Sequence, residues 1–191
     1  MIRHGPTAWN SEKRLQGHTD VPLSAEGRAV VSGWRVPAEL EAYRWVSSPL
    51  SRATETAKLL GAKQPEIEPR LTEMHYGDWE GRSLPELRQS LGKEMADNEA
   101  QGLDFQPDGG ERPREVQERL RCWLAEVGQM AEPTVAVSHH GVLRALYSLA
   151  TGWNMVDPLP EKFRWGAMHC FHVSDGGTVH LDRINVSIEP T

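Results

Sequence analysis

Two short apolar segments, each followed directly by a helix start, constrain the fold of this chain most strongly. Thr134 to Ser138 has the character of a buried strand, and a helical segment follows from Gly141 to Ala150. Tyr43 to Ser47 predicts another short strand, and Ser48-Pro49 then supplies a capping hydroxyl and a proline suited to a first helical turn. Strands that alternate with helices predict a layered α/β fold.

Further helices and strands are expected on both sides of these two units. In chain order they are a helix capped by Ser24, a helix opened by the capping box Ser83 to Glu86, an amphipathic helix from about Glu115 to Met130, and a terminal hairpin of two strands, Ala167 to Val173 and Thr178 to Ile184.

Composition narrows the classes of protein to which the chain can belong. Its 191 residues fit a single domain spanning residues 1–191. A formal net charge of −6 argues against nucleic acid as a partner but leaves an anionic substrate open. Cys122 and Cys170 do not indicate a disulfide framework, which fits a reducing compartment. Without a membrane-spanning apolar run or a signal-peptide pattern, the chain is expected to be cytoplasmic. Its oligomeric state is unreadable from sequence.

Basic and imidazole side chains lie where both predicted strands end. Arg52 falls in the first turn of the helix that follows Ser48-Pro49, and His139 and His140 stand directly after the strand that ends at Ser138. Helix N-termini favour phosphate, and ligands of α/β sheets bind at the carboxyl ends of the strands. The sequence therefore predicts an anion-binding site at this edge of the sheet.

The N-terminal segment adds further groups suited to a phosphate ligand. Arginine binds phosphate in a bidentate manner, asparagine and glutamine donate additional hydrogen bonds, and glycine permits close approach of the backbone. The residues of these types are Arg3, His4, Gly5, Asn10, Arg14, Gln16 and Gly17.

Five blocks of the sequence together resemble the signature of the histidine phosphatase superfamily, which has the phosphoglycerate mutase-like fold. The blocks are Arg3 to Asn10, Arg14 to Asp20 with Pro22 to Ser24, Ser47 to Ala53, Leu71 to Glu73 with Tyr76 to Gly81, and Val137 to Val142. An Arg-His-Gly triplet alone is a weak signal, whereas five blocks in family order are specific. The resemblance implies a three-layer α/β sandwich, with a mostly parallel mixed central sheet and helices on both faces.

The resemblance also implies a role for each matching residue. His4 would be the nucleophile that becomes phosphorylated, and Glu73 would give a proton to the leaving oxygen and then act as base for water. The binding residues would be Arg3, Arg52 and His139 around the phosphoryl group, Asn10 as a further donor to it, and Gln16 with the backbone of Gly17 beside the ester. The family uses no metal, and no cofactor is expected.

These roles set conditions that a structure can test. The His4 ring must be neutral, with its second nitrogen held by an acceptor that the sequence does not identify. Glu73 must be protonated in the first step, so its pKa must be raised. A protonated His139 would join the two arginines in matching the charge of the phosphoryl oxygens.

Some positions depart from the family pattern. Pro6 stands where the family often has glutamate, so position 6 receives no catalytic role. His140 stands where glycine is frequent; we favour His139 as the second catalytic histidine because it directly follows the strand, and place His140 among the substrate-binding residues. Segment 107–113 resembles a loop near the family's site, although Arg112-Pro113 departs from it.

Several other histidines are open to more than one interpretation. His18 and His75 either line the mouth of the pocket or are ordinary loop residues. His169 and His172 could suggest a metal site, but in a strand they point to opposite faces, so we predict a structural strand there.

The predicted activity is hydrolysis of a small phosphate ester by a phosphomonoesterase. Trp79-Glu80-Gly81 and the stretch Arg14 to Asp20 resemble the broad-specificity and α-ribazole phosphatases of the family. A mutase is the alternative, which His75-Tyr76-Gly77 favours and the short segment from Glu73 to His139 disfavours. A non-catalytic phosphate-binding module is less favoured, because the expected catalytic residues are all present.

The start of the sequence poses a structural question. The family places the Arg-His-Gly triplet at the end of a first, central strand, yet only Met1 and Ile2 precede Arg3. Either this strand is very short or residues upstream are missing, and His4 would then be held by a sheet edge with few anchoring residues.

Overall fold

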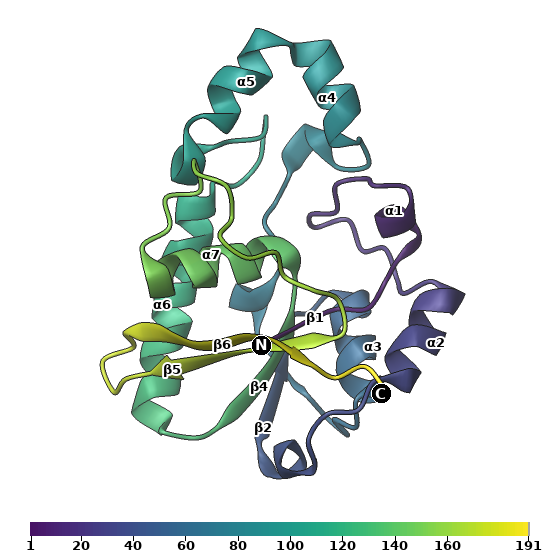
Figure 1. Ribbon diagram of the computed structural model, residues 1–191, viewed down its shortest axis with the longest axis vertical. Helices are drawn as coiled ribbons and strands as arrows, with labels where there is room; N and C mark the ends of the chain where they lie inside the picture. The colour runs from purple at the N-terminus through teal and green to yellow at the C-terminus, as the bar shows by residue number, and fades with distance from the viewer. Residues whose placement is uncertain (191) are drawn as a thin grey trace.

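A six-stranded mixed sheet forms the middle layer of the computed structural model, which describes residues 1–190 (Figure 1). The strands lie in the order β3-β2-β4-β1-β5-β6. They are β1 (Ile2–Arg3), β2 (Arg44–Ser47), β3 (Glu66–Ile67), β4 (Thr134–Ser138), β5 (Ala167–Val173) and β6 (Val179–Ser187). Only β5 runs against its neighbours, so the sheet is mostly parallel, as predicted.

Helices cover both faces of this sheet. The α-helices of the described residues are α1 (Ala8–Ser11), α2 (Ala25–Gly33), α3 (Ser51–Leu59), α4 (Leu84–Leu91), α5 (Lys93–Glu99), α6 (Pro113–Met130) and α7 (His140–Thr151). Neighbouring side chains of a strand point to opposite faces. Accordingly, Val137 of β4 packs in one core with Val31 of α2 and Ala53 of α3, while Ala136 packs in the other with Leu120 of α6 and Ala145 of α7. The predicted three-layer arrangement is therefore confirmed.

A small cap stands beyond one end of the sheet and consists of α4 and α5 (Figure 1). The predicted capping box opens α4, because the Ser83 hydroxyl accepts from Glu86 N and the Glu86 carboxylate accepts from Ser83 N. The cap has its own apolar cluster around Trp79, Leu87 and Met95. Helix α5 was not predicted, because Met95 is its only buried residue and no apolar periodicity marks it.

The start of α3 differs from the prediction. The helix begins at Ser51 rather than directly after Ser48-Pro49, and Leu50 occupies the capping position. The Ser48 hydroxyl still accepts from Leu50 N at 3.3 Å, but it also lies 2.7 Å from Nε2 of His139. Ser48 is therefore placed to serve the site as well as the turn.

Strand β1 has two residues and lies inside the sheet, so the expectation that a sheet edge holds His4 was wrong. Ile2 pairs with Val137 of β4 on one side and with Met168 of β5 on the other. His4 N donates to the Ser138 carbonyl at 2.9 Å, which continues the pairing with β4. Two flanking strands thus compensate for the shortness of β1.

Candidate active site

His4 leaves the carboxyl end of β1 as a buried side chain, 3% exposed. Its Nδ1 atom lies 2.7 Å from the carbonyl oxygen of Gly5. A carbonyl only accepts, so Nδ1 carries the proton and donates, and Nε2 keeps its lone pair. The acceptor that the sequence did not identify is thus the backbone of the next residue, which any residue type supplies and no motif reveals.

At Gly5, the lack of a side chain serves helix packing and not the expected close approach of the backbone to a ligand. A Cβ at this position would lie 2.2 Å from Cγ2 of Val31, so the missing side chain lets α2 pack against the end of β1. The Gly5 amide donates to the hydroxyl of Thr56 in α3 at 2.9 Å. The glycine therefore fixes the segment after His4 between two helices rather than making room for a ligand.

Arg52 and His139 reach the same pocket from the ends of β2 and β4. The centroid of the His139 ring lies 5.1 Å from that of His4. The Arg52 side chain is fully buried, and two of its N–H groups donate to the carbonyls of Gly17 at 2.9 Å and Thr19 at 3.1 Å. The convergence predicted from the two strand ends is therefore present.

The pocket around His4 contains buried donor atoms with no hydrogen-bond partner among residues 1–190. They are Nε of Arg3, Nε of Arg52, Nε2 of Gln16 and Nδ1 of His139. Leaving a buried polar group unpaired costs free energy, on the order of 1–3 kcal/mol for each group. Several unpaired donors on residues near His4 are suited to the oxygens of an anion.

Burial and positive charge keep both histidines of the pocket neutral. Burial, followed by the charges of Arg3 and Arg52, holds the pKa of His4 well below 6.5. Burial likewise lowers the pKa of His139, and the neighbouring basic groups lower it further. These groups favour the neutral form of His139, whereas a protonated form was expected from the sequence.

Glu73 lies buried at the N-terminus of α7. Its carboxyl oxygens accept from Met74 N at 2.9 Å, Gly141 N at 3.1 Å and Val142 N at 3.3 Å. Burial raises the pKa of Glu73, while these backbone bonds and the charges of the two pocket arginines oppose the rise. Glu73 thus meets the condition of a raised pKa, and its ionised form also has donors waiting for it.

The structure places the predicted substrate-binding residues in differing ways. The Gln16 side chain accepts from the Thr7 hydroxyl at 2.9 Å, which leaves its amide nitrogen free to donate to a ligand. The Asn10 side-chain oxygen accepts from Thr7 at 3.0 Å and closes the capping box of α1. Gly17 acts mainly through its carbonyl, which holds Arg52. Arg14 is exposed and paired with Glu12, away from the pocket.

His140 lies beside the pocket but does not contact His4 as His139 does. Its ring packs edge-on against Phe163, with centroids 6.1 Å apart. Burial and the charges of Arg3 and Arg144 lower its pKa to about 3, and its Nδ1 atom has no partner among the residues described. This geometry supports our preference for His139 as the second catalytic histidine.

His18 and His75 lie together next to the backbone of Glu73. Their ring centroids are 4.6 Å apart, and His18 Nε2 donates to the Glu73 carbonyl at 3.0 Å. Segment 107–113 packs beside them, since Glu111 N donates to the His75 carbonyl at 2.8 Å. The structure therefore places both histidines and this loop around Glu73.

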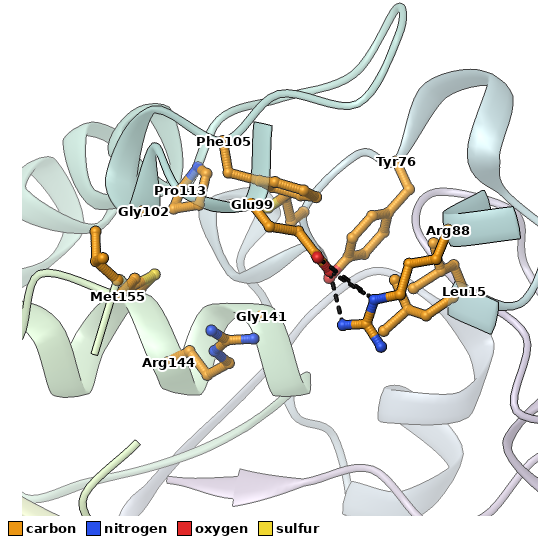
Figure 2. Close-up of a pocket in the computed structure, with 13 residues that line it drawn as sticks. Leu15, Tyr76, Arg88, Glu99, Gly102, Phe105, Pro113, Gly141, Arg144 and Met155 are labelled. Atoms are coloured by element: carbon orange, nitrogen blue, oxygen red, sulfur yellow. Dashed lines mark hydrogen bonds and ion pairs between the residues drawn. The ribbon is translucent and has the colours of Figure 1, made fainter. Parts of the chain in front are cut away.

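A cavity of about 320 Å³ lies between the cap and α7 (Figure 2). Met74 and Gly141, whose backbone N–H groups donate to Glu73, are among its lining residues. Its lining residues include Leu15, Met74, Tyr76, Leu84, Arg88, Glu99, Phe105, Gly141, Arg144 and Met155. Arg88 is neutralised by Glu99 at 2.7 Å, whereas Arg144 forms no ion pair with any residue described and lies with its Cζ 5.2 Å from the ring centroid of Trp153. The cavity is apolar on several sides and has one uncompensated cation.

Sequence reasoning missed Ser48, Arg144 and Trp165 as residues of this region. The Arg3 guanidinium stacks on the ring of Trp165, with Cζ 3.8 Å from the ring centroid. Each of the three is an ordinary residue type in a segment with another structural explanation. Their roles depend on tertiary contacts that no local pattern encodes.

Two further findings concern metals and membranes. Within residues 1–190, no group of three or more His, Cys, Asp or Glu side chains is arranged to hold a metal ion. His169 is buried and His172 is exposed on strand β5, which agrees with the predicted structural strand. No helix in this part of the chain has the length and apolar character needed to cross a membrane.

Residues 1–186 match the family model described as histidine phosphatase superfamily (branch 1). Phosphoglycerate mutase-like protein 4 of Arabidopsis thaliana is 34% identical over 161 residues, which cover 78% of this chain and 69% of that protein. Glucosyl-3-phosphoglycerate phosphatase of Mycolicibacterium vanbaalenii is 35% identical over 166 residues, covering 80% and 73%. A mycobacterial glucosyl-3-phosphoglycerate phosphatase solved with VO3 has a TM-score of 0.79 at 28% identity, covering 98% of each chain.

The fold and the site are those of an α/β protein of the phosphoryl-transfer class, with a neutral, buried histidine at the centre of the site. The chain belongs to branch 1 of the histidine phosphatase superfamily. The resemblance drawn from the five sequence blocks is thereby confirmed.

Proposed function

We propose that the protein is a phosphomonoesterase that transfers the phosphoryl group of a small phosphate ester to His4 and then to water. The observation that carries this proposal is the free Nε2 atom of His4 among buried donors that lack partners. Family membership supports it, as do relatives named phosphatases. A relative of the same fold has also been solved with inorganic phosphate.

In the first step, Nε2 of His4 attacks phosphorus in line with the leaving oxygen. The N–P bond forms as the P–O bond to the alcohol breaks, and Arg3 and Arg52 stabilise the charge on the equatorial oxygens. With Nε2 of His139 accepting from the Ser48 hydroxyl, its Nδ1–H has no partner among residues 1–190 and is available to donate to the same oxygens. Anion binding also raises the pKa of His139, since the bound charge favours the imidazolium.

Glu73 supplies the proton that the departing alkoxide needs. An alkoxide is a poor leaving group, so protonation lowers the barrier to P–O cleavage. The carboxylate that remains is stabilised by the backbone N–H groups of Met74, Gly141 and Val142. These donors make Glu73 able to give up a proton even though burial raises its pKa.

The second step reverses the role of Glu73. Its carboxylate takes a proton from water, the water oxygen attacks phosphorus, and the N–P bond to His4 breaks. Inorganic phosphate leaves, and both His4 and Glu73 return to their starting protonation states. No metal ion takes part in this scheme.

The cavity next to Glu73 is where we place the leaving group. Gly141 lines the cavity and donates to Glu73, and Arg144 stands one helical turn further along the same face of α7. An uncompensated guanidinium at this position favours an alcohol that carries its own anionic group, such as a carboxylate. The relatives named for phosphoglycerate-derived esters are consistent with this preference.

We infer that the chain forms a single domain over residues 1–191, is cytoplasmic, and needs neither metal nor cofactor. Its acid-dependent chemistry is of the histidine acid phosphatase type. No contact with nucleic acid or membrane is proposed.

A screen of phosphate esters that measures both released phosphate and isomerised ester tests the function directly. We expect inorganic phosphate as the product, with activity that survives a chelator. Isomerisation without net release of phosphate would identify a mutase instead. Strict dependence on an added metal would contradict the phosphohistidine scheme.

A further inference from the structure

Trp165 contacts the first arginine of the pocket, although no sequence motif includes it. The Cζ atom of Arg3 lies 3.8 Å from the Trp165 ring centroid. The same ring meets His4 edge-on, with centroids 6.0 Å apart. A guanidinium within about 6 Å of an indole face is attracted to it. One side chain therefore lies against both Arg3 and the nucleophile.

The strand register explains how Trp165 reaches this position. β5 runs antiparallel to β1, with Ile2 opposite Met168, so the residues just before Met168 lie alongside the end of β1. The two neighbours of Trp165 are anchored: Arg164 N donates to the side-chain oxygen of Asn185, and the Gly166 carbonyl accepts from Ile188 N, both at 2.8 Å. The backbone is therefore anchored on both sides of Trp165.

Arg3 and Arg52 are fixed in different ways. Arg52 donates to two backbone carbonyls, those of Gly17 and Thr19, which set its orientation. Arg3 makes no side-chain hydrogen bond or ion pair with any residue in 1–190, and its Nε atom is buried without a partner. Burial lowers the pKa of Arg3 to about 10, which leaves it charged at neutral pH. Its guanidinium is held instead by the face of Trp165.

Holding a guanidinium by its face has a chemical consequence. A guanidinium carries five N–H donors at its edge, and a carbonyl partner occupies some of them. An aromatic ring contacts the flat face and occupies none. With Trp165 against its guanidinium, Arg3 thus keeps N–H donors that no residue of 1–190 occupies.

We propose that Trp165 is a positioning residue that holds the Arg3 guanidinium in the plane required to bind the phosphoryl group. This inference rests on the phosphate-binding role proposed above for Arg3. The simpler interpretation is that Trp165 only fills space beside His4. In that case any large apolar side chain would serve equally well.

Calorimetric titration with inorganic phosphate separates the two interpretations without requiring turnover. We expect Trp165→Leu, which lacks an aromatic face, to weaken phosphate binding roughly tenfold. Trp165→Phe keeps a ring and should stay within about threefold of the unmodified protein. Trp45→Leu is the matched control, because Trp45 is also partly buried but lies near the amino end of β2, away from the carboxyl ends of the strands. The Trp45→Leu variant should bind phosphate normally.

The same titration in an Arg3→Gln background shows whether the effect passes through Arg3. We expect Trp165→Leu to cause no further loss there. Equal losses for the Leu and Phe variants, or a Leu variant that binds phosphate normally, would overturn the inference. Failure of the unmodified protein to bind phosphate at all would overturn the proposed function first, and this inference with it. If Trp165→Leu does not fold, the test uses Trp165→Phe and measures kcat and KM separately for one ester. A rise in KM of more than threefold in this variant would count against the proposal.

Discussion

The Nδ1 atom of His4 donates to the carbonyl oxygen of Gly5 across 2.7 Å, and this contact fixes the tautomer of the ring. The proton is held on Nδ1, so the lone pair of Nε2 is available for attack before any ester binds. Burial and the two arginines keep the ring neutral to well below pH 6.5. In the proposed mechanism, His4 therefore needs no general base to act as the nucleophile.

Replacing His4 should remove the covalent intermediate. We expect His4→Ala to abolish turnover of an aryl phosphate, because the variant has no atom to accept the phosphoryl group. In the unmodified protein, a rapidly quenched phosphoenzyme should be acid-labile and base-stable, as a phosphoramidate is. An acid-stable adduct, or full activity in His4→Ala, would point to another nucleophile.

Replacing Glu73 should affect esters according to their leaving groups. Glu73→Gln keeps the size of the side chain but cannot transfer a proton, so alkyl esters should lose about 10²–10⁴-fold in kcat. An activated aryl ester departs without protonation and should lose far less in the first step. The comparison is made by steady-state kinetics on one ester of each kind, and equal losses on both would remove Glu73 from the role of acid.

The pH profile should be displaced toward acid. Hydrolysis of an alkyl ester requires neutral His4, whose pKa lies well below 6.5, and protonated Glu73, whose pKa lies above 4.5. Activity should persist as pH falls below 6.5, where an ordinary histidine would lose its nucleophile, and should decline as pH rises through the raised pKa of Glu73. The prediction is checked by measuring kcat/KM as a function of pH for one alkyl and one aryl ester. Only the alkyl ester should show the decline at alkaline pH. Loss of activity on acidification near pH 6.5 would show that the burial of His4 does not control its ionisation.

Much of the site could be predicted because its residues stand at strand ends. Arg52 and His139 each follow a short apolar strand, and parallel strands bring their carboxyl ends to one edge of the sheet. His4, which continues the parallel pairing of β1 with β4, joins them for the same reason. Local patterns of strand and helix therefore indicated the meeting point, and the resemblance to the family indicated what the residues do there.

The remaining features depend on contacts between distant segments. The acceptor for His4 is a backbone carbonyl, and Trp165 reaches Arg3 only through the register of β5 on β1. The place of β1 inside the sheet also could not be read from its two residues. Such contacts are set by packing across the whole fold, and local residue patterns carry no trace of them.

Arg144 should determine which leaving groups are accepted. It lines the cavity beside Glu73 and lacks an ion pair among the residues described, while Arg88 on the same cavity is neutralised by Glu99 (Figure 2). We expect Arg144→Gln to lower kcat/KM about 10–100-fold for an ester whose alcohol carries a carboxylate, because a charge-assisted hydrogen bond is worth roughly 1.5–3 kcal/mol. An ester matched in size but uncharged should change little.

Arg88→Gln is the matched control for Arg144, since it removes an arginine that already has a counterion. Its effect on the same two esters should stay within about threefold, because exposed ion pairs contribute less than about 1 kcal/mol. Should Arg144→Gln reduce activity equally on the charged and uncharged esters, its contact with Trp153 would be structural and the cavity would not select for charge. A selective loss would instead place the second anionic group of the substrate beside Arg144, one helical turn from Gly141, whose N–H donates to Glu73.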